Sequence, residues 1–106
     1  SSDNIFIVKR GTVYTPPCYV GALEGITRGA IMELCGKLGY PLKEEPFTLH
    51  DVYTADEVFF TGTAAEVIPV REVDGRVIGV GHAGPITTKL LEEFRKIVTV
   101  EGVQAF

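Results

Sequence analysis

Short runs of β-branched and aromatic residues, separated by tight-turn signals, limit the folds open to this sequence most strongly. Arg10-Gly11 separates residues 4–9 (NIFIVK) from residues 12–15 (TVYT), and Asp74-Gly75 follows another such run. Two-residue connections join antiparallel strands, because a parallel crossover needs a dozen or more residues. The sequence therefore predicts about seven short strands, paired mostly as neighbouring hairpins. The strand-like runs cover residues 4–9, 12–15, 42–47, 57–62, 66–73 and 76–79.

Helical periodicity adds two main helices and one short helix. Residues 26–38 carry an apolar stripe at helical spacing, and Gly39 is expected to end that helix. Thr48 with Asp51 resembles a capping box that opens a short helix to about residue 53. Pro85 is suited to the first position of a final helix. These elements predict a mixed α+β fold, and Pro69 should place its strand at a sheet edge or a bulge.

Composition excludes several classes of function. The 106 residues suffice for one modest domain, spanning 1–106. The net charge is −4 and the basic residues are scattered, which argues against nucleic-acid and membrane surfaces. No apolar run approaches the roughly 20 residues that span a bilayer. The two histidines lack metal-ligand spacing, so no metal site is expected. Cys18 and Cys35 are interpreted as reduced thiols of a cytoplasmic protein.

Two loops could hold an anion. Leu23-Glu24-Gly25-Ile26-Thr27-Arg28 lies at the start of the first long helix, where backbone N–H groups are unpaired and carry partial positive charge. Gly25 would allow close approach to a phosphate and Thr27 could donate its hydroxyl; the alternative is an ordinary turn and helix cap. Residues 61–66 (TGTAAE) form a turn of small residues that could point N–H groups at a carboxylate, or simply link two strands.

Other candidates are weaker. Arg28 and Arg71 could bind an anion, but they are expected to face solvent or form salt bridges. Asp56 and Glu57 are adjacent in a strand and should face opposite sides, which argues against an acid–base pair. The spacing of residues 79–84 matches Gly-x-Gly-x-x-Gly, but it follows a hairpin strand outside any βαβ unit, so a dinucleotide site is not expected.

Taken together, residues 25–28 (GITR) and 55–66 (ADEVFFTGTAAE) resemble the class IV aminotransferases that use pyridoxal phosphate. The nearest resemblance is to branched-chain amino acid aminotransferases. Residues 15–17 (TPP), 73–76 (VDGR) and 84–87 (GPIT) also fall in that family's order. The resemblance covers nearly the whole chain and implies the C-terminal domain of the fold type IV, D-amino acid aminotransferase-like enzymes.

The resemblance implies roles for both loops. Gly25, Ile26 and Thr27 match the segment that binds the cofactor phosphate, and Leu23 matches a residue packed against the pyridine ring. Gly62 and Thr63 match a second cofactor-contacting turn. Thr63, Ala64 and Ala65 would present N–H groups to the substrate carboxylate. The implied partners are branched-chain amino acids and 2-oxo acids, with assembly into homo-oligomers.

The resemblance also implies what should lie outside this chain. The family's Schiff-base lysine and the glutamate that pairs with the pyridine nitrogen align upstream of Ser1, and no lysine here matches the catalytic position. The chain opens with Ser-Ser-Asp and no initiator Met, so we expect missing upstream sequence and no activity in the chain alone. D-amino acid aminotransferase, aminodeoxychorismate lyase and a non-catalytic binding or assembly module are the alternatives.

Overall fold

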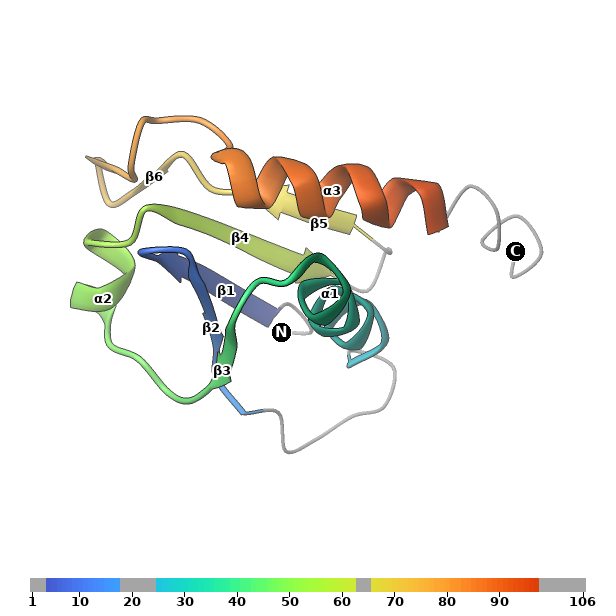
Figure 1. Cartoon of the computed structure of the whole chain (residues 1–106). Coiled ribbons are helices and arrows are strands. Elements are labelled where there is room, and N and C mark those ends of the chain that lie inside the picture. The colour runs from blue at the N-terminus through green and yellow to red at the C-terminus, as the bar shows by residue number, and fades with distance from the viewer. Residues whose placement is uncertain (1–3, 18–24, 63–65, 98–106) are drawn as a thin grey trace.

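The predicted strands and helices form in the computed structural model, which describes residues 4–17, 25–62 and 66–97. Figure 1 shows a sheet with α1 and α3 on one face and the short α2 at one end. This arrangement confirms the predicted α+β class. The elements are β1 (Asn4–Lys9), β2 (Thr12–Thr15), α1 (Gly25–Leu38), β3 (Leu42–Glu44), α2 (Leu49–Tyr53), β4 (Glu57–Gly62), β5 (Glu66–Pro69), β6 (Glu72–Val73), β7 (Arg76–Val77) and α3 (Pro85–Ile97).

Five strands form the main sheet in the order β3-β2-β1-β4-β5. The β1–β2 and β4–β5 pairs are antiparallel neighbours along the chain, as predicted, and β1 also pairs antiparallel with the distant β4. The β2–β3 pair is parallel, because α1 carries the chain back to the same end of the sheet before β3 begins. Pro69 lies on β5, an edge strand of the sheet, which confirms its predicted position.

The tight turns have the backbone that their sequences predict. Arg10 and Gly11 have φ angles of 52° and 81°, and Asp74 and Gly75 have φ angles of 51° and 80°. Positive φ at both central residues is typical of the type I′ turn, whose twist matches that of the flanking strands. Each turn therefore fixes the register of its hairpin.

The helix caps also follow the sequence. Gly39 has a φ of 82° after α1, and the next residue's N–H, on Tyr40, donates to the Cys35 carbonyl at 2.8 Å. At α2 the Asp51 N–H donates to the Thr48 hydroxyl at 3.2 Å, and the Thr48 N–H returns a bond to the Asp51 carboxylate at 2.8 Å. This reciprocal pair is the predicted capping box, and the Thr48 N–H lowers the pKa of Asp51.

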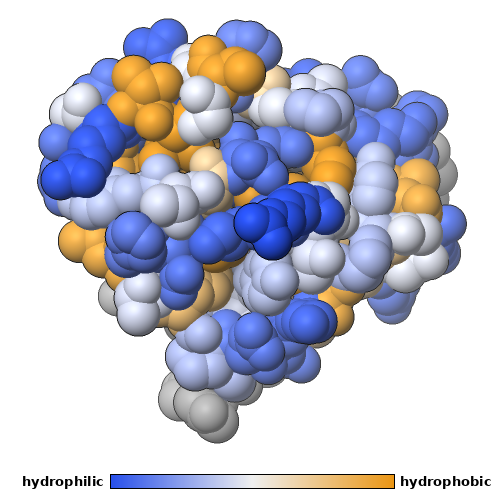
Figure 2. All heavy atoms as spheres, turned by 60° about the vertical axis from the view of Figure 1, so that its left-hand side comes forward, coloured by the Kyte–Doolittle hydropathy of each residue, from blue (hydrophilic) through white to orange (hydrophobic). Residues whose placement is uncertain are grey.

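The face of the sheet away from α1 and α3 is covered in part by α2 and the β6–β7 hairpin. Its buried cluster comprises Ile7, Val52, Ala55, Val58 and Ile78. Figure 2 brings the α2 and β6–β7 side forward and shows separate apolar patches among hydrophilic side chains.

Three strand predictions were too long. The strand expected over 66–73 breaks after Pro69, and β6 pairs with β7 in a separate sheet, because the chain leaves the edge of the main sheet to cover its face. The strand expected over 76–79 ends at Val77, before Gly79 with its positive φ of 53°. The strand expected over 42–47 ends at Glu44, just before the chain reaches Pro46.

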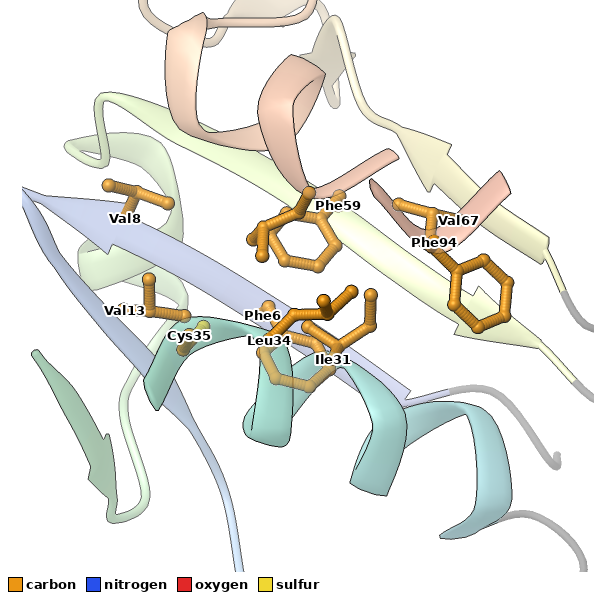
Figure 3. Packing of buried hydrophobic residues seen from close by; sticks show 10 residues of the cluster. Phe6, Val8, Val13, Ile31, Leu34, Cys35, Phe59, Val67 and Phe94 are labelled. Atoms are coloured by element: carbon orange, nitrogen blue, oxygen red, sulfur yellow. The ribbon is translucent and has the colours of Figure 1, made fainter. Parts of the chain in front are cut away.

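The larger core lies between the sheet and the two long helices. Phe6 and Phe59 are register partners on β1 and β4, and their rings stack with centroids 4.9 Å apart. Figure 3 shows these rings facing side chains from α1 and α3. The buried residues of this cluster are Phe6, Val8, Val13, Ile31, Leu34, Cys35, Phe59, Val67, Leu90 and Phe94. The core fixes both helices on one face of the sheet.

A buried carboxylate joins α3 to β4. The Glu57 side chain accepts the Thr87 N–H at 2.7 Å and the Ile86 N–H at 3.2 Å, so it caps the start of α3. Gly84 packs so closely that an added Cβ would lie 2.3 Å from the Glu57 Cδ. Asp56 instead accepts the Arg10 N–H at 2.8 Å. The two acids therefore bond to different elements, as their strand positions predicted.

Candidate functional site

The first turn of α1 contains part of the predicted phosphate segment. Gly25 begins the helix, Ile26 follows, and Thr27 is buried with 5% of its surface exposed. The first turn carries no acidic side chain. The N–H groups at a helix start lack partners within the helix and carry partial positive charge. This turn therefore suits an anion. Leu23, the other residue of the predicted segment, lies outside the described residues.

The end of β4 contains part of the second predicted segment. Gly62 is the last residue of the strand, and Thr61 before it is fully buried. Thr61 alternates with Phe59 and so shares the face covered by the helices. Thr63, Ala64 and Ala65 lie outside the described residues, so their predicted carboxylate contacts stay a prediction.

Both segments lie at the same end of the sheet. Asn4, at the start of β1, is the register partner of Thr61, and α1 also contacts β4. Figures 1 and 3 both show the first turn of α1 at the end where β1 begins and β4 ends. The structure therefore brings Gly25–Thr27 and Gly62 to one edge of the fold, although they are far apart in sequence.

The polar groups at this end fit an oxyanion such as a phosphate. Three buried side-chain polar atoms lack a hydrogen-bond partner within the described part of the chain. Two of these, Arg28 Nε and Thr61 Oγ1, belong to the first turn of α1 and the end of β4. Both can donate a hydrogen bond, and leaving a buried donor unpaired costs free energy, so a hydrogen-bond acceptor suits this end of the fold.

Arg28 joins this turn to the neighbouring strands, as its expected salt-bridged role required. It is 7% exposed, and its Nη2 donates to the Pro16 carbonyl at 2.9 Å and to the Glu44 carboxylate at 2.7 Å. Pro16 directly follows β2, and Glu44 is the last residue of β3. Neither acceptor was predicted from the sequence; the available signal was a cation three residues before Ile31, on the apolar stripe of the helix.

Two other helix starts already have carboxylate partners from the chain itself. Glu57 occupies the start of α3, and Asp51 with Thr48 occupies that of α2. A carboxylate on a helix N-terminus is thus a recurring arrangement in this fold. The first turn of α1 itself contains no acidic residue.

The opposite end of the sheet carries polar side chains and charges of both signs. A depression there is lined by Lys9, Arg10, Thr12, Tyr14, His50, Thr54 and Asp56. The Lys9 ammonium lies 3.5 Å from the Asp51 carboxylate.

Among the described residues, no group of three or more His, Cys, Asp or Glu side chains could hold a metal ion. No helix within those residues is long and apolar enough to cross a membrane.

All five lysines lie among the residues that the structure describes, and each is at least partly exposed in this chain. A Schiff-base lysine is typically desolvated or placed beside another cation. Lys9 is partly exposed and paired with an acid, and the other four lysines are exposed on the surface. Lys89 and Lys96 both lie beside Glu93, at 3.4 and 3.0 Å.

Known proteins resemble this chain closely. The family model for amino-transferase class IV matches residues 1–73. The branched-chain-amino-acid aminotransferase of Pseudomonas aeruginosa is 52% identical over 99 residues, which are 93% of this chain and 32% of that protein. The corresponding protein of Escherichia coli K12 is 45% identical over 101 residues, or 95% of this chain and 33% of that protein.

Solved structures give the same result. A branched-chain amino acid aminotransferase from T.th., complexed with N-(5'-phosphopyridoxyl)-L-glutamate, has a TM-score of 0.86 and 42% identity, covering 94% of this chain and 35% of that one. The branched-chain aminotransferase of Thermoproteus uzoniensis with norvaline has a TM-score of 0.80 and 52% identity, covering 91% and 31%. The chain thus spans about a third of the length of these relatives.

The family match covers residues 1–73, and the sheet with its two helices superposes on fold type IV aminotransferases. The chain therefore belongs to the class IV aminotransferase family and is homologous to its branched-chain amino acid aminotransferases.

Proposed function

We propose that this chain is the C-terminal, cofactor-binding part of a branched-chain amino acid aminotransferase. The complete protein would transfer the amino group of leucine, isoleucine or valine to 2-oxoglutarate, with pyridoxal phosphate as cofactor. The observation that carries this proposal is the meeting of the α1 start and the β4 end at one end of the sheet. Related structures hold a phosphopyridoxyl-glutamate adduct and pyridoxamine 5'-phosphate, which supports the choice of cofactor.

Each site residue has a proposed task. The backbone N–H groups of Gly25, Ile26 and Thr27, with the Thr27 hydroxyl, bind the cofactor phosphate, because this helix start attracts an anion. Gly62 and Thr63 form the second cofactor-contacting turn. When bound, the cofactor supplies an electron sink for the reaction at the substrate α-carbon.

The remaining assignments orient the ring and the substrate. Leu23 is proposed to pack against the pyridine ring. The N–H groups of Thr63, Ala64 and Ala65 bind the substrate α-carboxylate, since a turn of small residues can point successive N–H groups at one anion.

The Schiff-base lysine and the glutamate for the pyridine nitrogen are proposed to lie on polypeptide outside this chain. The complete protein is proposed to be a homo-oligomer. The chain alone should then show no transamination, since the groups proposed to form the covalent link and to move the proton would lie outside it.

Cofactor titration of this chain, followed by borohydride reduction and peptide mapping, tests the division of the site. We expect no stoichiometric adduct on any one lysine of this chain. A single stoichiometric adduct at one lysine would show that the chain carries its own Schiff-base residue, and the proposed division would be wrong.

The role of Thr27 is tested in the complete enzyme by Thr27→Val, with Thr88→Val on the exposed side of α3 as the matched control. A hydrogen bond to a charged group contributes about 1.5–3 kcal/mol, so the cofactor Kd should rise about 10- to 100-fold for Thr27→Val. Thr88→Val should leave it unchanged. An unaltered Kd for a folded Thr27→Val protein would remove Thr27 from the phosphate site.

A substrate panel tests the choice of enzyme. Leucine, isoleucine and valine should be the preferred amino donors. A preference for D-alanine over leucine would favour a D-amino acid aminotransferase instead.

A further inference from the structure

Arg28 lies where an apolar side chain would be expected. It precedes Ile31 and Cys35 at the i, i+3, i+7 spacing of one helix face, and both of those residues are fully buried. Arg28 itself is 7% exposed. Removing a guanidinium from water is costly unless its charge and its N–H groups are partnered. The position therefore needs a reason beyond packing.

The contacts of Arg28 join three elements. From the first turn of α1, its Nη2 reaches the Pro16 carbonyl at 2.9 Å, just after β2, and the Glu44 carboxylate at 2.7 Å, at the end of β3. The two acceptors lie at the adjacent ends of paired strands, because Thr15, which precedes Pro16, is the register partner of Glu44. The Glu45 N–H also donates to the Thr15 carbonyl at 2.9 Å. Arg28 thus bonds to the ends of β2 and β3, which are themselves joined by a hydrogen bond.

Arg28 and its contacts lie next to the segment proposed to bind the phosphate. Thr27 immediately precedes Arg28, and Gly25 begins the same turn. The first turn of a helix has the fewest internal hydrogen bonds, so its position depends on side-chain contacts. Anion binding by backbone N–H groups requires them to converge on one point, and a shift of about 1 Å weakens such a site severely.

We propose that Arg28 is a positioning residue for the phosphate-binding segment Gly25–Thr27. It acts through the Pro16 carbonyl and the Glu44 carboxylate, which fix the first turn of α1 against the ends of β2 and β3. This inference rests on the proposed function. Lysine keeps the charge but lacks the planar guanidinium with its additional N–H groups, so it should replace Arg28 only in part.

The test uses the complete enzyme with Arg28→Gln, Arg28→Lys and Glu44→Gln. Arg95→Gln is the matched control, because Arg95 is exposed on α3. Pyridoxal phosphate Kd is measured by fluorescence titration, at a temperature where circular dichroism shows each protein folded. Amide hydrogen exchange of the cofactor-free proteins is compared between residues 26–30 and residues 34–38.

We expect Arg28→Gln to raise the Kd by about tenfold or more, corresponding to about 1.4 kcal/mol, and Arg28→Lys to raise it less. Glu44→Gln keeps a neutral acceptor and should have the smallest effect of the three. Arg95→Gln should match the wild type. Exchange should accelerate over residues 26–30 and remain unchanged over residues 34–38, a local effect that a purely global loss of stability would not produce.

The failures are distinguishable. A folded Arg28→Gln protein with wild-type Kd and wild-type exchange overturns the positioning role and leaves the proposed function intact. If Arg28→Gln does not fold, Arg28→Lys decides: wild-type cofactor affinity overturns the inference, and weakened affinity in a folded protein supports it. A wild-type enzyme that binds no pyridoxal phosphate overturns the proposed function and this inference with it.

Discussion

Replacing Glu57 with glutamine should destabilise the protein by about 2–4 kcal/mol. Glu57 is 6% exposed and accepts two N–H groups at the start of α3, from Thr87 at 2.7 Å and from Ile86 at 3.2 Å. A hydrogen bond to a charged acceptor contributes about 1.5–3 kcal/mol, and a charge at a helix end about 0.3–1 kcal/mol. Glutamine keeps one acceptor oxygen and loses one bond together with the charge, which gives the stated sum.

Gly84 supplies a coupled perturbation. An added Cβ would lie 2.3 Å from the Glu57 Cδ and 2.4 Å from its Cγ, so Gly84→Ala must displace the carboxylate. In a Glu57→Ala background that obstruction is gone. The double variant should therefore be more stable than the sum of the single effects predicts, by about 1–2 kcal/mol.

These free energies are measured by urea unfolding of the purified proteins, with circular dichroism as the signal. They are compared between variants that have equal m-values. Asp56→Asn is the matched control, because asparagine can still accept the exposed Arg10 N–H, and it should change stability by less than about 0.5 kcal/mol. A Glu57→Gln protein within about 0.5 kcal/mol of the wild type would refute the capping argument. Additivity of Glu57→Ala and Gly84→Ala would refute the steric one.

Further predictions concern Cys35 and two other glycines. Burial raises the pKa of the Cys35 thiol to about 11, so iodoacetamide at pH 8 should label it only after denaturation; fast labelling of the native protein would contradict its burial. The pKa of the thiol in the folded protein lies above the ordinary value of 9.0, so the stability that this shift contributes is complete below pH 9. That stability should be lost as pH rises towards about 11, by at most about 1.4 kcal/mol per pH unit, and urea midpoints would show the loss. Gly79→Ala should destabilise by about 3 kcal/mol or more, because its Cβ would lie 2.1 Å from the Asp56 carbonyl oxygen and its φ is 53°. Gly36→Ala, with nothing within 4 Å of the added carbon, should instead stabilise α1 by about 0.5–1 kcal/mol; thermal unfolding of the pair tests both signs.

Local sequence determined most elements, because their signals depend on neighbouring residues. Arg10-Gly11 and Asp74-Gly75 fixed two hairpin turns through their positive φ angles. Thr48 with Asp51 fixed the start of α2 through a bond pattern contained within four residues. The spacing of apolar residues located α1 to within one residue at each end, and Pro85 located the start of α3.

The candidate site was predictable as two segments, not as one place. Gly25–Thr27 and Gly62 each had the composition of an anion-binding loop, and the family resemblance linked them. Their meeting at one end of the sheet depends on β1 pairing with β4, with Asn4 opposite Thr61. Such pairing joins residues more than fifty positions apart, which no local pattern encodes.

Sequence alone thus determined the α+β class, the turns, the helix caps and the family resemblance, since each depends on local chemistry or on an ordered set of motifs. Tertiary structure alone decided the parallel β2–β3 pair, the capping of α3 by Glu57 and the bonds from Arg28 to Pro16 and Glu44. These depend on which distant groups burial brings together. A buried charge must then find partners wherever the packed elements supply them.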